Sequence, residues 1–276
     1  MSSPSVPHLD TELATRVLVR FLRDEAARAG FTRLVLGLSG GIDSAVAAFL
    51  AAHAVGPENV VALALPWRGS NPQSLEHGRL VASAAGIALG VADLTAAADG
   101  LLAVLPAPTP HRTGNVLARL RMVTLWDRSL AERALVVGTS NKTELLLGYG
   151  TLHGDLASAL NPLGDLWKCQ VRALARHLGV PEPVISKPPS ADLWEGQTDE
   201  GELGFTYDQA DAVLSRLVDA RETPNALVAA GFHRELVDAI VRRVVQNQYK
   251  RRGPLIAKLS RRTVGWEFRY PRDWAT

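Results

Sequence analysis

The stretch LVLGLSGGIDS, residues 34–44, predicts a strand that ends in a glycine-rich loop. Its first five residues form a short apolar run, which is typical of a buried strand. The alanine-rich run AVAAFLAAHAV, residues 45–55, follows at once and predicts a helix. The sequence SGGIDS therefore joins the end of a strand to the start of a helix.

This loop has the chemistry of a phosphate-binding site. Its two adjacent glycines let the backbone turn tightly and approach a ligand without obstruction by a Cβ atom. Its two serine hydroxyls can donate hydrogen bonds to phosphate oxygens. The following helix directs free N–H groups and the positive end of its dipole at the same point. S-G-G is also a common flexible turn, but the strand before it and the helix after it favour phosphate binding.

Asp43 within the loop predicts a metal ion. An aspartate alone would repel phosphate, whereas Mg²⁺ is commonly held by one or two carboxylates together with phosphates. The loop lacks the lysine and the spacing of G-x-x-x-x-G-K-[ST], so it is not a Walker A loop.

The rest of the pattern alternates strands with helices, which predicts an α/β fold with a parallel sheet flanked by helices. Loops that follow the strands of such a sheet lie at its carboxyl end, where ligands bind. Beyond residue 203 helical spacing dominates, so we expect one domain over residues 1–276, with an α/β core at 1–203 and a helical C-terminal region at 204–276. The predicted strands lie at 34–38, 60–66, near 91–94 and 134–139, the predicted helices include 10–29 and 115–133, and a proline-rich loop is predicted at 104–114.

Composition sets limits on the class of protein. Hydrophobic residues make up 47% of the chain and charged residues 21%, which is typical of a globular protein. The single cysteine, Cys169, excludes an internal disulfide. The N-terminus lacks a secretory pattern and no apolar stretch is long enough to span a bilayer, so we expect a cytoplasmic protein without membrane contact. The histidines show no metal-ligand spacing, so we expect no zinc site.

SGGIDS resembles the pyrophosphate loop of the ATP pyrophosphatases, an adenine nucleotide alpha hydrolase-like superfamily that cleaves ATP between the α and β phosphates. Three further blocks are similar to the NAD synthetase family: GNVLARLRM at 114–122, the run at 136–168 and the run at 187–211. The resemblance runs from about residue 10 to about residue 260. The resemblance implies an ammonia-dependent NAD synthetase, which adenylates deamido-NAD with ATP and then displaces AMP with ammonia.

The resemblance also implies the roles of individual residues. NQYKRR, residues 247–252, departs from relatives that have histidine where this chain has Tyr249. The implied ATP contacts are Ser39, Gly40, Gly41, Ile42, Asp43, Ser44, Thr139, Lys168 and Ser190. The implied deamido-NAD contacts are Arg119, Tyr149 and Lys250, the implied Mg²⁺ ligands are Asp43 and Glu144, and the implied catalytic residues are Asp43, Lys168 and Asp155.

The chemistry of these side chains agrees with the implied roles. Glu144 and Asp43 each follow a predicted strand, so two carboxylates can meet over one set of phosphates. Lys168 can neutralise charge on the α-phosphate and on the departing pyrophosphate. Tyr149 can stack on a pyridine ring. Asp155 can orient or deprotonate ammonia, although an aspartate in a glycine-rich loop is more often a turn former.

The resemblance implies a homodimer and gives no reason to expect nucleic acid as a partner. Glutamine-dependent relatives carry a glutaminase domain, and we expect none before residue 39. The sequence leaves open whether a separate glutaminase delivers ammonia.

Two other functions are alternatives to an ammonia-dependent NAD synthetase. Another adenylating amidotransferase of the superfamily is the enzyme alternative, and a tRNA sulfur-insertion enzyme fits less well because it commonly uses paired cysteines. An adenine-nucleotide sensor is the non-enzyme alternative, disfavoured by Asp43, Glu144 and Lys168.

Overall fold

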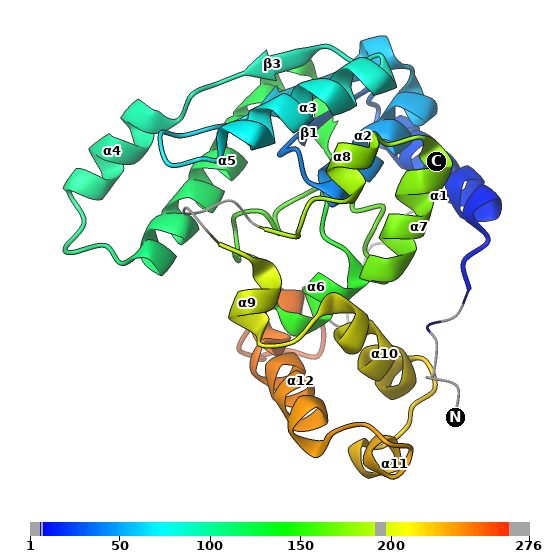
Figure 1. The fold of residues 1–276 in the computed structure, drawn as a ribbon. Helices are drawn as coiled ribbons and strands as arrows, with labels where there is room; N and C mark the ends of the chain where they lie inside the picture. Colours follow the sequence, from blue (N-terminus) through cyan, green and yellow to red (C-terminus); the bar gives the residue numbers. More distant parts are fainter. Residues whose placement is uncertain (1–5, 7, 191–196, 265–276) are drawn as a thin grey trace.

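The computed structural model describes residues 6, 8–190 and 197–264. Residues 191–196 of the family-like block at 187–211 and the terminal residues 265–276 lie outside this part. Figure 1 shows an α/β layer with the cluster of helices α9–α12 beneath it. Within the described part, none of the helices has the length and apolar character needed to cross a membrane.

The strands of the described part form a four-stranded parallel sheet in the order β3-β2-β1-β4. The central strand β1 pairs in parallel with β2 on one side and with β4 on the other. The predicted parallel α/β architecture is therefore confirmed. The strands are β1 (Arg33–Gly37), β2 (Val60–Ala64), β3 (Leu89–Val91) and β4 (Ala134–Val136).

Both faces of the sheet are covered, which explains why β1 is a continuous apolar run and not an alternating one. Leu34 and Leu36 belong to the large core cluster on the side of α1 (Thr11–Arg28), α2 (Ile42–Val55), α3 (Pro72–Ala85) and α7 (Lys168–Leu178). Val35 points to the other side, where it packs in a cluster with Leu125 of α5 (Pro110–Glu132). Side chains on successive strand residues face opposite ways, so the two helical layers are separated by one sheet.

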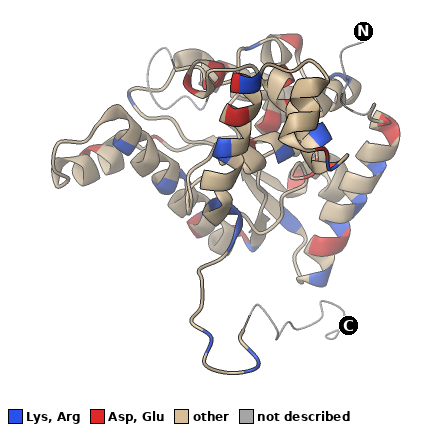
Figure 2. Ribbon diagram, turned by 90° about the horizontal axis from the view of Figure 1, so that it is seen from below, with Lys and Arg blue, Asp and Glu red and all other residues tan. Residues whose placement is uncertain are grey.

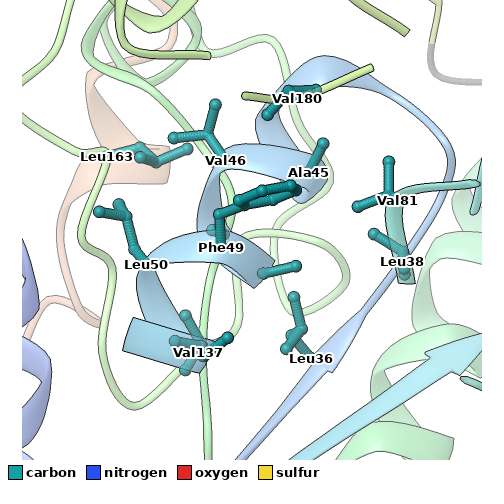
Figure 3. Close-up of a cluster of buried hydrophobic side chains, with 14 of the residues drawn as sticks. Leu36, Leu38, Ala45, Val46, Phe49, Leu50, Val81, Val137, Leu163 and Val180 are labelled. Carbon is teal, nitrogen blue, oxygen red and sulfur yellow. The ribbon is translucent and has the colours of Figure 1, made fainter. Parts of the chain in front are cut away.

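Helix α2 is the centre of the larger core (Figure 3). Its Phe49 and Leu50 pack between Leu36 of β1 and side chains from other helices. Each such side chain contributes roughly 1.5–3 kcal/mol when it is fully removed from water. The alanines on either side of Phe49 and Leu50 are small, so neighbouring elements approach α2 closely. This close packing fixes the start of α2 relative to β1.

The order of the strands creates a switch point beside β1. The chain runs from β1 to β2 and outward to β3, and then returns to the opposite side of β1 as β4. In open α/β sheets ligands bind in the crevice at the carboxyl ends of the strands, at such a point. The loops after β1 and β4, residues 38–41 and 137–141, flank this crevice.

The C-terminal helices form a second core cluster that also includes earlier residues. Leu214 and Ile240 pack there together with Leu147 and Trp167, which precede the expected boundary at residue 203. Helices α6 (Lys142–Leu147) and α9 (Asp199–Leu203) contribute Leu147 and Leu203 to this cluster, which continues with α10 (Tyr207–Val218), α11 (Pro224–Ala229) and α12 (Arg234–Gln246). Helix α8 (Glu182–Ile185) packs in the larger core instead. The chain also contains two short 3₁₀ helices, η1 (Pro57–Asn59) and η2 (Gln248–Arg251). Helix α4 (Thr95–Ala103) lies between β3 and α5 in the sequence.

Several boundary predictions were wrong. The strands predicted at 60–66 and 134–139 end at Ala64 and Val136. The predicted loop at 104–114 overlaps α5, which begins at Pro110 because the Thr109 side chain caps it and proline is tolerated in the first turn. The third strand ends at Val91 and not near residue 94, because the Asp93 carboxylate accepts from the Thr95 amide and turns the chain into α4.

The described residues after η2 have no helix up to residue 264 and are mostly exposed. Figure 2 shows this segment extending away from the helices, with Lys and Arg along it. Basic residues of the C-terminal region therefore lie partly on this segment and partly on α12.

Candidate functional site

The glycine-rich loop is held by hydrogen bonds between its own serines. The Ser44 hydroxyl donates to the Gly41 carbonyl oxygen at 2.9 Å and accepts from the Ser39 amide at 3.2 Å. The two serine hydroxyl oxygens lie 3.1 Å apart. Helix α2 then begins at Ile42, and its N-cap residue Gly41 offers no side chain to cap the first amides. These amides and hydroxyls together form an anion-binding surface at the carboxyl end of β1.

Gly40 is required where the loop touches α3. Its φ is +73°, in the left-handed region, and a Cβ atom placed there would lie 2.2 Å from the Ser74 carbonyl oxygen. Any other residue would force the loop away from the first turn of α3. Gly40 therefore serves the loop through its backbone geometry.

Four side chains beside the loop form a closed ring of hydrogen bonds. The Lys168 ammonium donates to Asp43 Oδ2 at 2.5 Å and to Glu144 Oε1 at 2.9 Å. The Asn141 amide group donates to Asp43 Oδ1 at 2.8 Å, and the Asn141 backbone N–H donates to Glu144 Oε2 at 3.2 Å. Each carboxylate oxygen of Asp43 and Glu144 thus has one donor. We call these four residues the carboxylate ring.

Burial makes the charges of the ring interdependent. The Lys168 side chain is 2% exposed, and those of Asp43 and Glu144 are 16% and 14% exposed. Burial and the charge of Asp43 raise the pKa of Glu144, and Lys168 offsets part of this effect. Burial also lowers the pKa of Lys168, but the charges of Asp43 and Glu144 outweigh it, so this pKa lies above its ordinary value. The ammonium is therefore charged at neutral pH.

The ring fits the hypothesis of a magnesium site. Both carboxylates already reach a single cation, the Lys168 ammonium, which shows that they converge on one point. Within the described residues no cluster of three or more His, Cys, Asp or Glu side chains is placed to hold a metal. Two carboxylates suit Mg²⁺, which takes its remaining ligands from phosphates and water, better than a transition metal held by protein alone.

Asn141 was not among the predicted site residues. Its side chain also accepts from the Glu144 amide at 3.0 Å, so it caps α6 while it contacts Asp43. The capping pattern, asparagine followed by glutamate three residues later, was visible in the sequence. The contact with Asp43 was not, because it depends on how β1 and β4 pair.

A cavity of about 720 Å³ opens over the ring and the loop. Its volume lies within the range of small-molecule sites. The structure brings most of the predicted site residues to its wall. These are Ser39, Gly41, Ile42, Asp43, Ser44, Thr139, Glu144, Tyr149, Asp155, Lys168, Ser190 and Lys250.

The loop at 148–155 is braced from two sides. The Tyr149 hydroxyl donates to carboxylate oxygens of Asp199 and Glu202, both at 2.9 Å. The Lys250 ammonium donates to the carbonyl oxygens of Gly148 and Gly150 at 2.7 and 2.9 Å. Lys250 therefore supports the loop as well as facing the cavity.

Asp155 is the acid of this loop that lines the cavity. Its carboxylate accepts from the Thr151 amide at 2.8 Å, so it is also a turn former, as its sequence context indicated. Burial raises the pKa of Asp155, and hydrogen bonds from Thr151 and the charge of Lys250 partly offset this. The group combines the turn role with a position on the cavity wall.

Arg119 lies apart from the other predicted ligand-binding residues. Its guanidinium is exposed, donates to the carbonyl oxygens of Asn115 and Leu152, and does not line the cavity of this chain. Gly40 likewise is not part of the cavity wall.

Two arginines that face the cavity were not singled out as ligands. Arg121 donates to the Leu65 carbonyl oxygen at 3.2 Å and lines the cavity from α5. Arg243 lines it from α12, and its buried Nε has no hydrogen-bond partner among the described residues. Lys and Arg are frequent in the sequence after residue 221, but this frequency does not distinguish Arg243 from its exposed neighbours.

The sheet, the glycine-rich loop at its switch point and the two converging carboxylates define an α/β nucleotide-binding protein with a phosphate-binding loop. The family model described as NAD synthase matches residues 14–254. The chain therefore belongs to the NAD synthase family, as its sequence blocks predicted.

Relatives and solved structures agree with this membership. A protein of Trichlorobacter lovleyi named NH(3)-dependent NAD(+) synthetase is 55% identical over 267 residues, 97% of this chain and 98% of that protein. The NH3-dependent NAD synthetase structure of Campylobacter jejuni is 32% identical, with a TM-score of 0.78 over 91% of this chain and 100% of that chain. An NMN synthetase structure from Francisella tularensis is 31% identical, with a TM-score of 0.81 over 91% of this chain and 99% of that chain.

A longer relative has the same fold in part of its length. The glutamine-dependent NAD+ synthetase structure of Acinetobacter baumannii matches 97% of this chain but only 51% of that chain, at 30% identity and a TM-score of 0.68.

Proposed function

We propose that this protein is an ammonia-dependent NAD synthetase that converts deamido-NAD, ATP and ammonia to NAD, AMP and pyrophosphate. The observation that carries the proposal is the carboxylate ring beside the uncapped start of α2, on the wall of one cavity. Curated relatives that match nearly the whole chain bear that name.

The reaction has two steps in this cavity. First, the nicotinate carboxylate attacks the α-phosphorus of ATP, the bond to the β-phosphate oxygen breaks, and pyrophosphate leaves. Ammonia then attacks the carbonyl carbon of the adenylate, loses a proton, and AMP leaves with the bonding electrons. The proteins of this family contribute position and electrostatics to both steps.

The glycine-rich loop and Lys168 act on the phosphates. The free amides of α2 and the hydroxyls of Ser39 and Ser44 bind phosphate oxygens. Lys168 balances the negative charge that moves onto pyrophosphate as it leaves. Thr139 and Ser190 contribute polar contacts to ATP from the same wall.

Asp43 and Glu144 would hold Mg²⁺, which when bound neutralises phosphate charge. Both residues reach the common cation position that the Lys168 ammonium marks.

The other end of the cavity takes the nicotinate half. Tyr149 is fixed through its hydroxyl, which leaves its ring face for the pyridine. Asp155 receives the proton from ammonia, a role that its raised pKa suits. Lys250 lies beside it and binds anionic groups of deamido-NAD.

Free ammonia is the direct nitrogen donor of this chain. A cysteine-dependent glutaminase needs a reactive thiolate, and the one cysteine of the sequence is Cys169. Burial, followed by the charge of Asp211, raises the pKa of that thiol to about 12. A separate protein that delivers ammonia is compatible with this reading.

The active form is a homodimer joined through α5. Arg119, Val123, Trp126 and Leu130 recur at helical spacing on one face of this helix. Leu130 is 83% exposed and Val123 57% exposed, which is unfavourable unless another surface covers them. A second copy of the chain over this face would bring Arg119 to the interface, close to deamido-NAD. The Leu130→Asp variant should have a monomer mass by light scattering, and an unchanged dimer mass would contradict this interface.

The chain acts as a single domain in this proposal. The cavity wall combines residues of the α/β core with Arg243 and Lys250 of the helical region, so neither part alone forms the complete site.

The test is a pyrophosphate-release assay with Mg²⁺, ATP and ammonium chloride. Deamido-NAD should trigger release together with NAD formation, and ammonia-free glutamine should not replace ammonium. Nicotinate mononucleotide is the matched alternative acid, because a structural neighbour is named an NMN synthetase. A preference for the mononucleotide would change the substrate, and release without any acid would reject the amidation.

A further inference from the structure

Asp211 is a buried carboxylate that the reaction described above does not use. It lies on α10 with no exposed surface, in the helical region after the α/β core. One carboxylate oxygen accepts from the Thr143 hydroxyl at 2.5 Å, and the other accepts from the Cys169 backbone N–H at 2.8 Å. Asp211 therefore contacts the first turns of α6 and α7 at the same time.

The Thr143 hydroxyl extends this contact to Lys168. Its oxygen accepts from the Lys168 backbone N–H at 3.0 Å while its proton is donated to Asp211. The first two amides of α7 are thus satisfied by side chains from two other helices. A negative charge at this helix start also interacts favourably with the helix dipole.

The residues held in this way carry half of the carboxylate ring. Lys168 is the first residue of α7, and Glu144 follows Thr143 in the first turn of α6. The Lys168 ammonium must reach both Asp43 and Glu144 within hydrogen-bond distance. A small shift between α6 and α7 would open these contacts, because the two helices approach each other at their first turns.

We propose that Asp211 is a positioning residue, which clamps the starts of α6 and α7 so that Glu144 and Lys168 meet Asp43 at the ATP site. The inference rests on the proposed function, which assigns the carboxylate ring to the binding of Mg²⁺ and ATP. It goes beyond that function by assigning a role to a residue that touches neither ATP nor deamido-NAD. It also gives the helical region a direct part in the adenylation step.

Packing alone does not account for an acid at this position. Burial of a carboxylate is unfavourable unless hydrogen bonds compensate, and an apolar side chain would join three helices at lower cost. The hydrogen bonds of Asp211 are directed at the two helix starts that bear the ring.

The chain offers a matched control on the same pair of helices. Asp208, one turn before Asp211 on α10, accepts from Arg172 of α7 at 2.7 Å, but its side chain is 72% exposed. Asp208→Asn removes a surface contact between α10 and α7 and leaves both helix starts untouched. Asp211→Asn removes the buried one.

The experiment compares wild type, Asp211→Asn, Thr143→Val, Thr143→Ser and Asp208→Asn. We expect Asp211→Asn and Thr143→Val to lower kcat by about 10- to 100-fold, as is usual when the support of a binding group is removed. The KM for deamido-NAD should stay within about twofold, because the nicotinate end is unchanged. Thr143→Ser keeps the hydroxyl and should retain nearly normal kcat, as should Asp208→Asn.

Two further measurements separate positioning from stability. In a Lys168→Ala background, Asp211→Asn should add little to the loss of kcat, since both changes disable the same contact. Calorimetry with Mn²⁺ and ATP should show about tenfold weaker binding for Asp211→Asn and unchanged binding for Asp208→Asn, each at a temperature where the variants are folded. The measurement of Mn²⁺–ATP binding does not depend on which carboxylic acid the enzyme amidates.

The results distinguish the two proposals. A wild type that binds Mn²⁺–ATP but does not amidate deamido-NAD rejects the proposed function, while the binding arm still tests Asp211. A lower melting temperature for Asp211→Asn with unchanged kcat and unchanged Mn²⁺–ATP binding would show that the residue serves stability alone and would overturn the inference.

Discussion

The helix starts that border the cavity are built in opposite ways. Helix α2 follows the N-cap residue Gly41, which has no side chain, so its first amides are free of side-chain caps. Helices α6 and α7 begin beneath Asn141, Thr143 and Asp211, which satisfy their amides from inside the protein. The two kinds of helix start therefore perform two different tasks in one site. A free helix start offers its backbone to a ligand, and a capped one holds its side chains in place.

The largest effect should come from removing a charge of the ring. Asp43→Asn and Glu144→Gln should each lower pyrophosphate release by about 10³-fold, because they disable cation binding and leave Lys168 partly unpaired. The pairing of Asp43 and Glu144 with a buried lysine means that both variants should also melt at lower temperature, which thermal unfolding measures. Near-normal turnover in Asp43→Asn would reject the metal assignment.

A second test acts on the free helix start through Gly40. Gly40→Ala should raise the KM for ATP by about 100-fold, because the added methyl group displaces the loop from α3. The control is Gly30→Ala, where φ is +77° but nothing lies within 4 Å of the added carbon. Both variants should lose about 1–2 kcal/mol from the left-handed backbone. If both had the same KM for ATP, the contact with Ser74 would have no role in binding.

A third test concerns Asn141, which caps the start of α6. Asn141→Ala should lower kcat by about tenfold or more, since Asp43 loses a donor and Glu144 loses its helix cap. Thr223→Ala removes the cap of α11, far from the ring in the sequence, and controls for the cost of about 1 kcal/mol that any lost cap brings. Steady-state kinetics with matched urea unfolding would measure both effects. Equal kinetics in the two variants would mean that Asn141 is only a cap.

A fourth test concerns the nicotinate end of the cavity. Arg243→Ala should raise the KM for deamido-NAD by about fivefold and leave kcat nearly unchanged, because its guanidinium faces the cavity with a free Nε. The neighbouring Arg242 is exposed and does not line the cavity, so Arg242→Ala is the control. A matching rise in both variants would indicate a general effect of surface charge, which salt would screen.

The smallest effect is expected for Cys169. Its thiol pKa of about 12 leaves almost no thiolate at pH 7 to 8, so iodoacetamide should label the folded protein slowly. Cys169→Ser should keep its rate with ammonium. Rapid labelling that stops activity, or glutamine use lost in Cys169→Ser, would reverse the assignment of the nitrogen donor.

The parts of this comparison that depend on local sequence could be predicted. The strand, loop and first turn of α2 are continuous in the chain, so the phosphate loop was visible before the structure. The approach of Glu144 to Asp43 was also predictable, because both follow parallel strands. The place of Lys168 came from family resemblance, since nothing in its local sequence points to the other two residues.

The remaining contacts depend on packing between distant segments. Asp211 is 68 residues from Thr143 and 42 from Cys169, and its role follows from how α10 crosses α6 and α7. The prediction of where α5 starts was wrong for a different reason. Thr109 and Pro110 are a regular helix start, but the prolines around them gave the segment the composition of a loop.

The carboxylate ring also has a consequence for how the protein folds. Lys168 is 125 residues from Asp43, and Asn141 is 98 residues from it, so these are long-range contacts that close only after much of the chain is ordered. If one segment of the ring came loose, a buried charge would lose its partner, at a cost of about 3–5 kcal/mol. The ring therefore links the unfolding of β1, β4 and α7 into one cooperative event, and the recovery of ATP binding during refolding reports the completion of the whole sheet and not of the glycine-rich loop alone.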